Sequence, residues 1–171
     1  MLVHSFAPVA RADARVLILG SMPGAASLAA GRYYAHPRNA FWPIVGALCG
    51  FDPMAPYRSR LRALQHAGIA LWDVLHSCER AGSLDGDIRA ASMRANDFAA
   101  FFTRHRRLEL VACNGGTAWT QFARVRGEVA GTAAVRCVRL PSTSPAHAAR
   151  SHAQKLATWR RALSPFLPCA V

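Results

Sequence analysis

The sequence lacks the patterns that mark several large protein classes. None of its apolar runs approaches the ~18 residues that a transmembrane helix needs. Residues 1–15 contain no basic segment followed by a hydrophobic one, as a signal peptide would. The GxGxxG and GxxxxGK[ST] patterns of nucleotide-binding loops are absent, and so is the GxSxG signature of serine hydrolases. We therefore expect a cytoplasmic protein without membrane association and without nucleotide-dependent chemistry.

Cysteine is present but never clustered. The five cysteines are widely spaced and form no CxxC pair. Zinc and iron–sulfur sites usually draw on such closely spaced ligands. We therefore expect no metal site, and nothing else in the sequence indicates a cofactor. Cys113 and Cys137 fall inside predicted strands and are interpreted as buried thiols.

Acidic residues are scarce. Nine Asp and Glu stand against 21 Arg and Lys, which gives a formal charge of +12, and Lys155 is the only lysine. Biased genome composition would explain the choice of arginine over lysine, but it does not explain the shortage of acids. A charge excess of this size on a small domain favours polyanions, with nucleic acid ahead of an anionic membrane surface.

Four short segments predicted as strands alternate with segments of helical periodicity. The predicted strands are residues 16–19, 69–75, 108–113 and 134–140, and helices are predicted at 39–48, 57–66, after an N-cap at Asn96 or Asp97, at 117–123 and around 156–163. This alternation predicts an α/β fold with a four-stranded parallel sheet and helices on both faces. With no linker, repeat or low-complexity segment, residues 1–171 are predicted to form a single domain.

Four loops are predicted to leave the same edge of this sheet, after Leu19, Val74, Cys113 and Leu140. Ligands bind in α/β sheets at the carboxyl ends of the strands. The first loop breaks regular structure with closely spaced glycine and proline residues and is rich in rings and amides, and no acid occurs in residues 20–51. Such a lining suits a planar, uncharged, hydrogen-bonding object such as a nucleobase.

Each loop residue also has a purely structural interpretation. Asn114 stands before two glycines and is typical of a turn, while Asp73 is more simply explained as a loop cap. His147 is compatible with a helix start or with a phosphate contact. The hydroxyls of residues 142–144 suit phosphate binding and ordinary loops alike.

Several stretches taken together resemble the uracil-DNA glycosylase superfamily. They are GSMPGAASL, YYAHPRNAFW, LWDVLHSC, GSLD and LPSTSPAHA, and they are similar above all to its hypoxanthine-DNA (deoxyinosine) glycosylase branch. A more distant similarity is to the mismatch-specific uracil/thymine branch. The resemblance implies a uracil-DNA glycosylase-like fold and a monofunctional glycosylase of base-excision repair. Such an enzyme hydrolyses the N-glycosidic bond of a deaminated base flipped out of DNA. Hypoxanthine is the expected base and uracil the alternative.

The resemblance also implies roles for individual residues. Asn39 is expected to be catalytic and to position the attacking water, Tyr34 to stack on the flipped base, and Asn114 to hydrogen-bond the base edge. The full base-binding set is Gly20, Ser21, Met22, Tyr34, Phe41 and Asn114. The expected DNA-binding set is Ser27, Ser142, Thr143, Ser144, His147 and Arg150.

Three positions depart from the superfamily pattern. Met22 stands where several branches have an Asp or Asn that handles the attacking water, and Leu140 where a His or Asn often contacts the base. The hypoxanthine branch is expected to rely on Asn39 instead. Ser144, a small residue, stands where a residue commonly wedges into the duplex, so either this loop does not insert or another side chain takes that role.

The predicted partner is double-stranded DNA that contains a deaminated base. The protein itself is predicted to be a cytoplasmic monomer associated with the nucleoid. Two other functional classes fit the same sequence. One is a non-catalytic nucleic-acid-binding domain, and the other is a hydrolase of free nucleosides.

Overall fold

A four-stranded parallel sheet forms the centre of the computed structural model, which describes residues 1–82 and 84–168. The strands lie in the order β3-β2-β6-β7 and comprise Ile69–Asp73, Val16–Gly20, Leu110–Asn114 and Arg136–Leu140 respectively. All three pairings are parallel. The predicted four-stranded parallel sheet is therefore confirmed.

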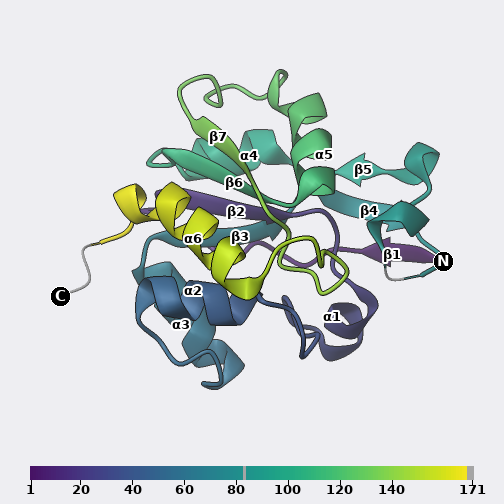
Figure 1. The fold of residues 1–171 in the computed structure, drawn as a ribbon. Helices are drawn as coiled ribbons and strands as arrows, with labels where there is room; N and C mark the ends of the chain where they lie inside the picture. Colours follow the sequence, from purple (N-terminus) through teal and green to yellow (C-terminus); the bar gives the residue numbers. More distant parts are fainter. Residues whose placement is uncertain (83, 169–171) are drawn as a thin grey trace.

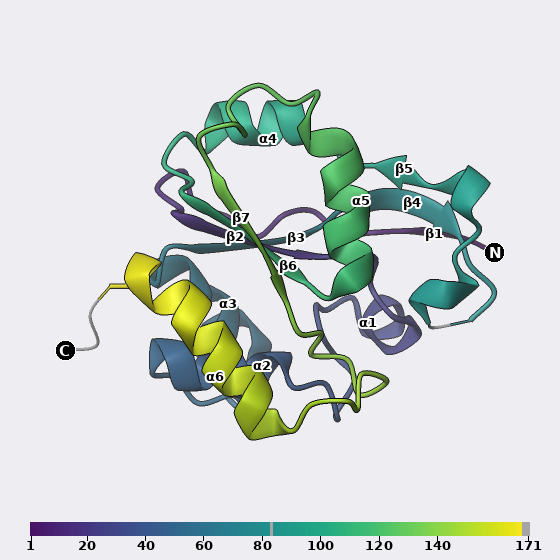
Figure 2. The same cartoon turned by 45° about the horizontal axis from the view of Figure 1, so that its top comes forward.

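Helices cover both faces of this sheet (Figures 1 and 2). One layer contains α2 (Phe41–Cys49), α3 (Tyr57–His66) and α6 (His152–Leu163), and the other contains α4 (Phe98–Arg104) and α5 (Gly116–Arg126). Residues along β2 alternate between the two cores, with Val16 and Ile18 in the first and Leu17 and Leu19 in the second. A strand buried on both faces has an uninterrupted apolar sequence, which is why the sequence pattern located β2.

A second, smaller sheet was not predicted. The apolar run at residues 69–75, predicted as one strand, is divided at Val74 into β3 and β4 (Leu75–Glu79). Strand β4 pairs antiparallel with β1 (Leu2–His4) and with β5 (Arg94–Ala95). The loop predicted to follow Val74 was therefore wrong over residues 75–79, where the chain forms β4.

Short helical turns complete the chain. Helix α1 (Ala25–Ala30) lies within the first loop, and 3-10 turns occur at Asp85–Asp87, Ala90–Ser92 and Ser164–Phe166. None of the helices in the described ranges is long and apolar enough to span a membrane.

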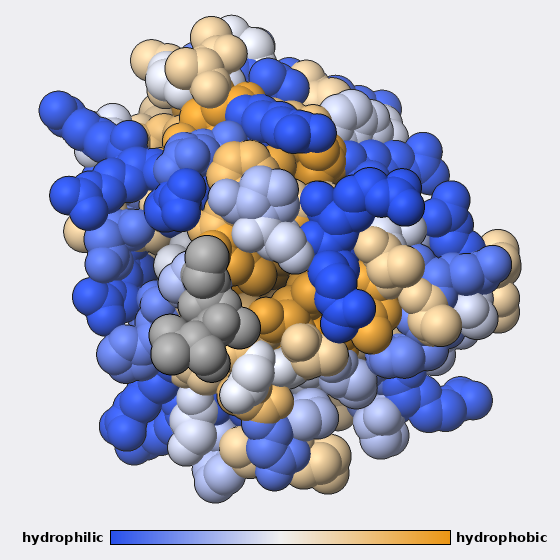
Figure 3. All heavy atoms as spheres, turned by 60° about the vertical axis from the view of Figure 1, so that its left-hand side comes forward, coloured by the Kyte–Doolittle hydropathy of each residue, from blue (hydrophilic) through white to orange (hydrophobic). Residues whose placement is uncertain are grey.

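The amino ends of the strands and the carboxyl end of α6 meet on one side of the molecule. Arg15, directly before β2, donates a hydrogen bond of 3.0 Å to the carbonyl of Phe166. Hydrophilic side chains surround an apolar area on this side (Figure 3). Three exposed arginines lie at the same edge of the sheet: Arg104 is the last residue of α4, and Arg106 and Arg107 follow it before β6.

Candidate active site

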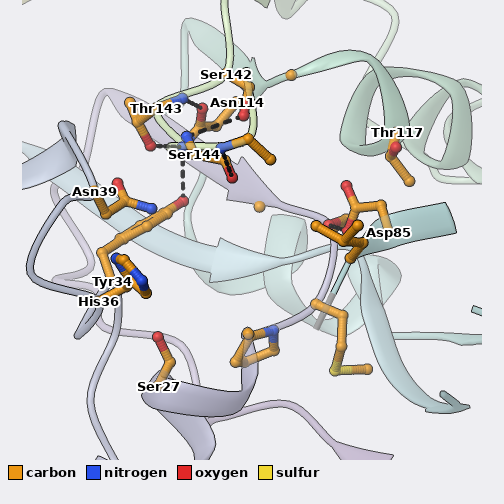
Figure 4. Close-up of a pocket in the computed structure, with 18 of the residues that line it drawn as sticks. Ser27, Tyr34, His36, Asn39, Asp85, Asn114, Thr117, Ser142, Thr143 and Ser144 are labelled. Atoms are coloured by element: carbon orange, nitrogen blue, oxygen red, sulfur yellow. Dashed lines mark hydrogen bonds between the residues drawn. The ribbon is translucent and has the colours of Figure 1, made fainter. Parts of the chain in front are cut away.

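The carboxyl ends of the four parallel strands open into a cavity of about 540 Å³ (Figure 4). That volume is within the range of small-molecule sites. Most of the predicted site residues line it: Gly20, Ser21, Met22, Ser27, Tyr34, Asn39, Asn114, Ser142, Thr143, Ser144 and His147. The structure thus brings together residues from three of the four predicted loops, and Asp73 represents the remaining one.

Gly20 makes a close approach possible at the end of β2. It is aligned with Asp73 across the β2–β3 pair. A Cβ atom on Gly20 would collide with the Asp73 carboxylate and would lie 3.2 Å from Oη of Tyr34. Only glycine leaves room for both side chains here.

Tyr34 forms a rigid aromatic wall of the cavity. Its backbone has a φ of 53°, which non-glycine residues rarely adopt. Its ring is stacked on Phe41, with 3.9 Å between centroids and an interplanar angle of 17°. Burial, followed by the charge of Asp73, raises the pKa of Tyr34, so the hydroxyl is neutral.

Phe41 does not reach the cavity. It is fully buried and packs behind Tyr34, so the structure places it as support for that ring and not in the lining.

The side-chain amide of Asn39 has a defined orientation. Its Oδ1 accepts a hydrogen bond of 3.0 Å from the backbone N–H of Phe41 at the start of α2. Because only the oxygen can accept from an N–H, Nδ2 is the atom left to donate. None of the hydrogen bonds within the described part of the chain uses Nδ2. The amide is thus held by one end and presents a donor with the other.

Asn114 connects two loops to Tyr34 (Figure 4). Its Nδ2 donates to Oη of Tyr34 at 3.1 Å and to Oγ1 of Thr143 at 2.9 Å, and its Oδ1 accepts from the backbone N–H of Thr143 at 2.9 Å. Both donor hydrogens are therefore used within the protein. Asn114 fixes the positions of the residues around it, and the second lone pair of Oδ1 is what remains for a ligand.

The chain turns tightly after Asn114. Gly115 has a φ of 101°, and a Cβ atom there would lie 3.1 Å from Cβ of Ser142. Glycine is required by both the backbone conformation and the close approach. The turn brings the start of α5 against the loop that follows β7.

Two carboxyl groups line the cavity, contrary to the expectation from residues 20–51. Asp73 is 3% exposed, and its Oδ2 has no hydrogen-bond partner among the described residues. Burial, reinforced by the charge of Asp85 and opposed by Arg80, raises the pKa of Asp73 to about 8. Asp73 is thus a neutral acid at pH 7, able to donate a hydrogen bond. Asp85 accepts a 2.6 Å hydrogen bond from Oγ of Ser21.

Asp73 is a site residue that sequence reasoning missed. Its one sequence signal was its position at the carboxyl end of a buried run, and that signal was outweighed by the loop-cap interpretation. Asp85 belongs to GSLD, a motif used for the family resemblance but given no role.

Among the residues that the structure describes, the basic groups of the lining are histidines and not arginines. His36 and His147 are half-buried there, and His36 was missed by the sequence reasoning. Arg150 is exposed and lies outside the lining, where its guanidinium is 3.4 Å from Oγ1 of Thr158.

Three of the smaller lining residues play partly structural roles. Oγ of Ser27 accepts from the backbone N–H of Ala35 at 3.1 Å. Oγ of Ser142 accepts from the N–H of Ser144 at 3.2 Å. Met22 is buried in a small core beside the second sheet while it also borders the cavity.

Known proteins share this fold and much of this sequence. The family model described as "Uracil DNA glycosylase superfamily" matches residues 7–166. A Methanosarcina barkeri protein named hypoxanthine DNA glycosylase is 37% identical over 113 residues, which are 66% of this chain and 70% of the relative. A Methanosarcina acetivorans protein of the same name is 35% identical over 129 residues, which are 74% and 80% of the two chains.

A solved structure is similar along nearly the whole chain. It is the solution NMR structure of a Methanosarcina acetivorans protein provisionally named a uracil DNA glycosylase. The TM-score is 0.77 at 31% sequence identity, with 94% of this chain and 98% of the other covered. Because the family model covers all but the two ends, this chain belongs to the uracil DNA glycosylase superfamily.

Proposed function

We propose that this protein is a DNA glycosylase of base-excision repair that releases hypoxanthine from DNA. Family membership and two relatives named hypoxanthine DNA glycosylase support this activity. The observation that carries the proposal is the composition of the cavity. A rigid tyrosine wall, a free amide donor on Asn39 and a neutral carboxylic acid on Asp73 surround one space.

Hydrolysis of the N-glycosidic bond transfers the bonding electron pair to the base. Water oxygen attaches to C1′ of the sugar and loses a proton, and the base leaves with a developing negative charge that takes up a proton from solvent. Donors already fixed around the base stabilise this charge without reorganising. Nδ2 of Asn39 and the acid proton of Asp73 are two such donors, and no hydrogen bond among the described residues uses either of them.

Hypoxanthine presents carbonyl and ring-nitrogen acceptors to such donors. An ionised Asp73 would repel the departing base, so the raised pKa suits this chemistry. Oδ1 of Asn39 retains a lone pair for the attacking water. As the base leaves, the sugar approaches an oxocarbenium ion. Because such an ion accepts a weak nucleophile, no residue is assigned as a general base.

The proposed substrate is duplex DNA, bound by a monomer in the nucleoid-associated cytoplasm. Base flipping costs a few kcal/mol. Backbone contacts by the hydroxyl-bearing loop of residues 142–144, by His147 and Ser27 and by Arg150 would offset part of that cost. The charge of +12 attracts DNA to the molecule as a whole.

A panel of lesions tests the function. Duplexes that contain hypoxanthine, uracil or xanthine are incubated with the protein and treated with alkali, which breaks strands at abasic sites. We expect breaks at hypoxanthine first, with uracil as the alternative base. Binding without breaks would indicate a non-catalytic domain. Release of hypoxanthine from free deoxyinosine, with little dependence on salt, would indicate a nucleoside hydrolase.

The role of Asn39 is tested by a matched pair of variants. Asn39→Asp keeps the oxygen that accepts from Phe41 but removes the amide donor, whereas Asn39→Ala removes both. We expect each to lose about 10²–10³-fold in single-turnover rate, as when one fixed donor is removed from an active site. Only Asn39→Ala should also lose helix stability. Excision by Asn39→Asp at the wild-type rate would remove the donor from the mechanism.

A further inference from the structure

One large apolar side chain is exposed at the cavity. In the described part of the chain the exposed large hydrophobic residues are Met1 at 87%, Leu2 at 57%, Met54 at 85% and Leu84 at 56%. Of these, only Leu84 lines the cavity. Single exposed apolar residues are common on protein surfaces, so the position of Leu84, and not its exposure alone, is the informative feature.

The backbone that carries Leu84 is fixed in place. Its N–H donates to Oδ2 of Asp87 at 3.1 Å, and its carbonyl accepts from the N–H of Asp87 at 3.0 Å. The next residue, Asp85, is held by Ser21 on the first loop. The side chain is therefore presented to solvent from a turn that is tied to the wall of the cavity.

The loop after β7 offers no comparable side chain. Residues 142–147 are Ser, Thr, Ser, Pro, Ala and His, and Thr143 is almost fully buried. Pro145 is the largest exposed apolar member of this loop. A nucleotide that leaves the duplex creates a gap in the base stack, and proteins that unstack DNA commonly fill such gaps with leucine, methionine, phenylalanine or proline.

We propose that Leu84 is the wedge that enters the DNA base stack at the position vacated by the flipped nucleotide. This inference rests on the proposed glycosylase function. Insertion moves an aliphatic side chain that is 56% exposed in the free protein out of water. It stabilises the flipped state in duplex DNA and has no corresponding role on a single strand, where no stack needs to be filled.

The test compares Leu84→Ala with Met54→Ala, which truncates an even more exposed apolar side chain outside the cavity lining. Single-turnover excision is measured on a deoxyinosine duplex and on the same single strand. We expect Leu84→Ala to lose about tenfold or more on the duplex, the scale of burying one leucine. On the single strand it should stay within about twofold of wild type, within the usual range of surface substitutions. Leu84→Met and Met54→Ala should retain duplex activity.

A second measurement applies even where the single strand is not cleaved. The adenine analogue 2-aminopurine, placed beside deoxyinosine in the duplex, fluoresces when it is unstacked. We expect Asn39→Asp to increase this fluorescence on binding, and Asn39→Asp combined with Leu84→Ala to increase it much less.

Three outcomes would overturn the wedge. The first is full duplex activity of Leu84→Ala. The second is an equal loss by Leu84→Ala on duplex and single strand, which indicates a contact with the base. The third is a duplex-specific loss in Pro145→Ala and not in Leu84→Ala. Absence of excision by the wild-type protein from either substrate would instead refute the glycosylase function itself.

Discussion

Replacing Asp73 by asparagine should make the protein more stable while impairing its activity. In the native state the pKa of this carboxyl is raised from 3.8 to about 8 because the group is buried. Unfolding returns it to water, where it ionises at neutral pH. Each unit of pKa difference corresponds to about 1.4 kcal/mol. Keeping the proton on Asp73 at pH 7 therefore lowers the free energy of unfolding by about 4 kcal/mol.

The pH dependence has a definite sign. Between about pH 4 and pH 8 the native state holds the Asp73 proton and the unfolded state does not, so the free energy of unfolding falls as pH rises. Below the unfolded pKa of 3.8 both states hold the proton, and Asp73 then costs the native state no ionisation energy. This stability is lost as pH rises toward the native pKa of about 8. An asparagine has no proton to lose and almost the same shape, so the variant should lack this dependence.

Urea unfolding of both proteins at several pH values measures the effect. The advantage of Asp73→Asn should increase by about 4 kcal/mol between pH 5 and pH 8. Contributions from the histidines and other carboxyls cancel in the difference because both proteins share them. Parallel stability curves across this range would show that Asp73 is not a buried neutral acid, and the proposed donor role would be lost with it.

The activity of the same pair provides an independent comparison. Wild-type excision should decline as pH rises through about 8, because ionised Asp73 repels the departing base. Asp73→Asn should be slower but should show no such decline. A decline of equal size in both proteins would assign it to another group.

Three further predictions concern the walls of the cavity and the surrounding charge. Gly20→Ala should reduce excision by about 10²-fold, because displacement of a catalytic group by about 1 Å can have that effect; wild-type kinetics would refute the close packing described above. Asn114→Ala should lower the free energy of unfolding by about 1–3 kcal/mol, measured in urea, because Tyr34 loses a buried partner. Arg150→Ala should reduce the slope of log affinity against log salt by about one unit, whereas Arg106→Ala, at the opposite sheet edge, should leave it unchanged; equal slopes in both variants would exclude a phosphate contact by Arg150.

The sequence predicted the central sheet and the edge at which the cavity lies. Strands β2, β3 and β6 are buried on both faces, and such strands appear as largely apolar sequence even without a relative for comparison, whereas the edge strand β7 is partly exposed and contains two arginines. The polar loops could then be placed together, because parallel strands have their carboxyl ends at one edge. The cavity confirms that Tyr34, Asn39 and Asn114 lie around one space.

The second sheet and the charge of the cavity could not be predicted in this way. Strands β1 and β5 contain three and two residues, too few for a period-two pattern, and they pair with β4 across long stretches of sequence. The shortage of acids in one loop did not describe the cavity, because Asp73 and Asp85 come from other segments. Whether a carboxyl lacks a partner depends on tertiary packing, which single-sequence patterns do not contain.

At Val74, the residue between the two sheets, backbone hydrogen bonds connect the small sheet to the wall of the cavity. The N–H of Val74 donates a hydrogen bond of 2.8 Å to the carbonyl of Gly20. The N–H of Leu75 donates one of 3.1 Å to the carbonyl of Ser21. The backbone around the start of β4 is thus bonded directly to the loop that forms the cavity wall. A substitution that displaces β4 should therefore also displace Gly20 and Asp73, although β4 lies outside the cavity lining.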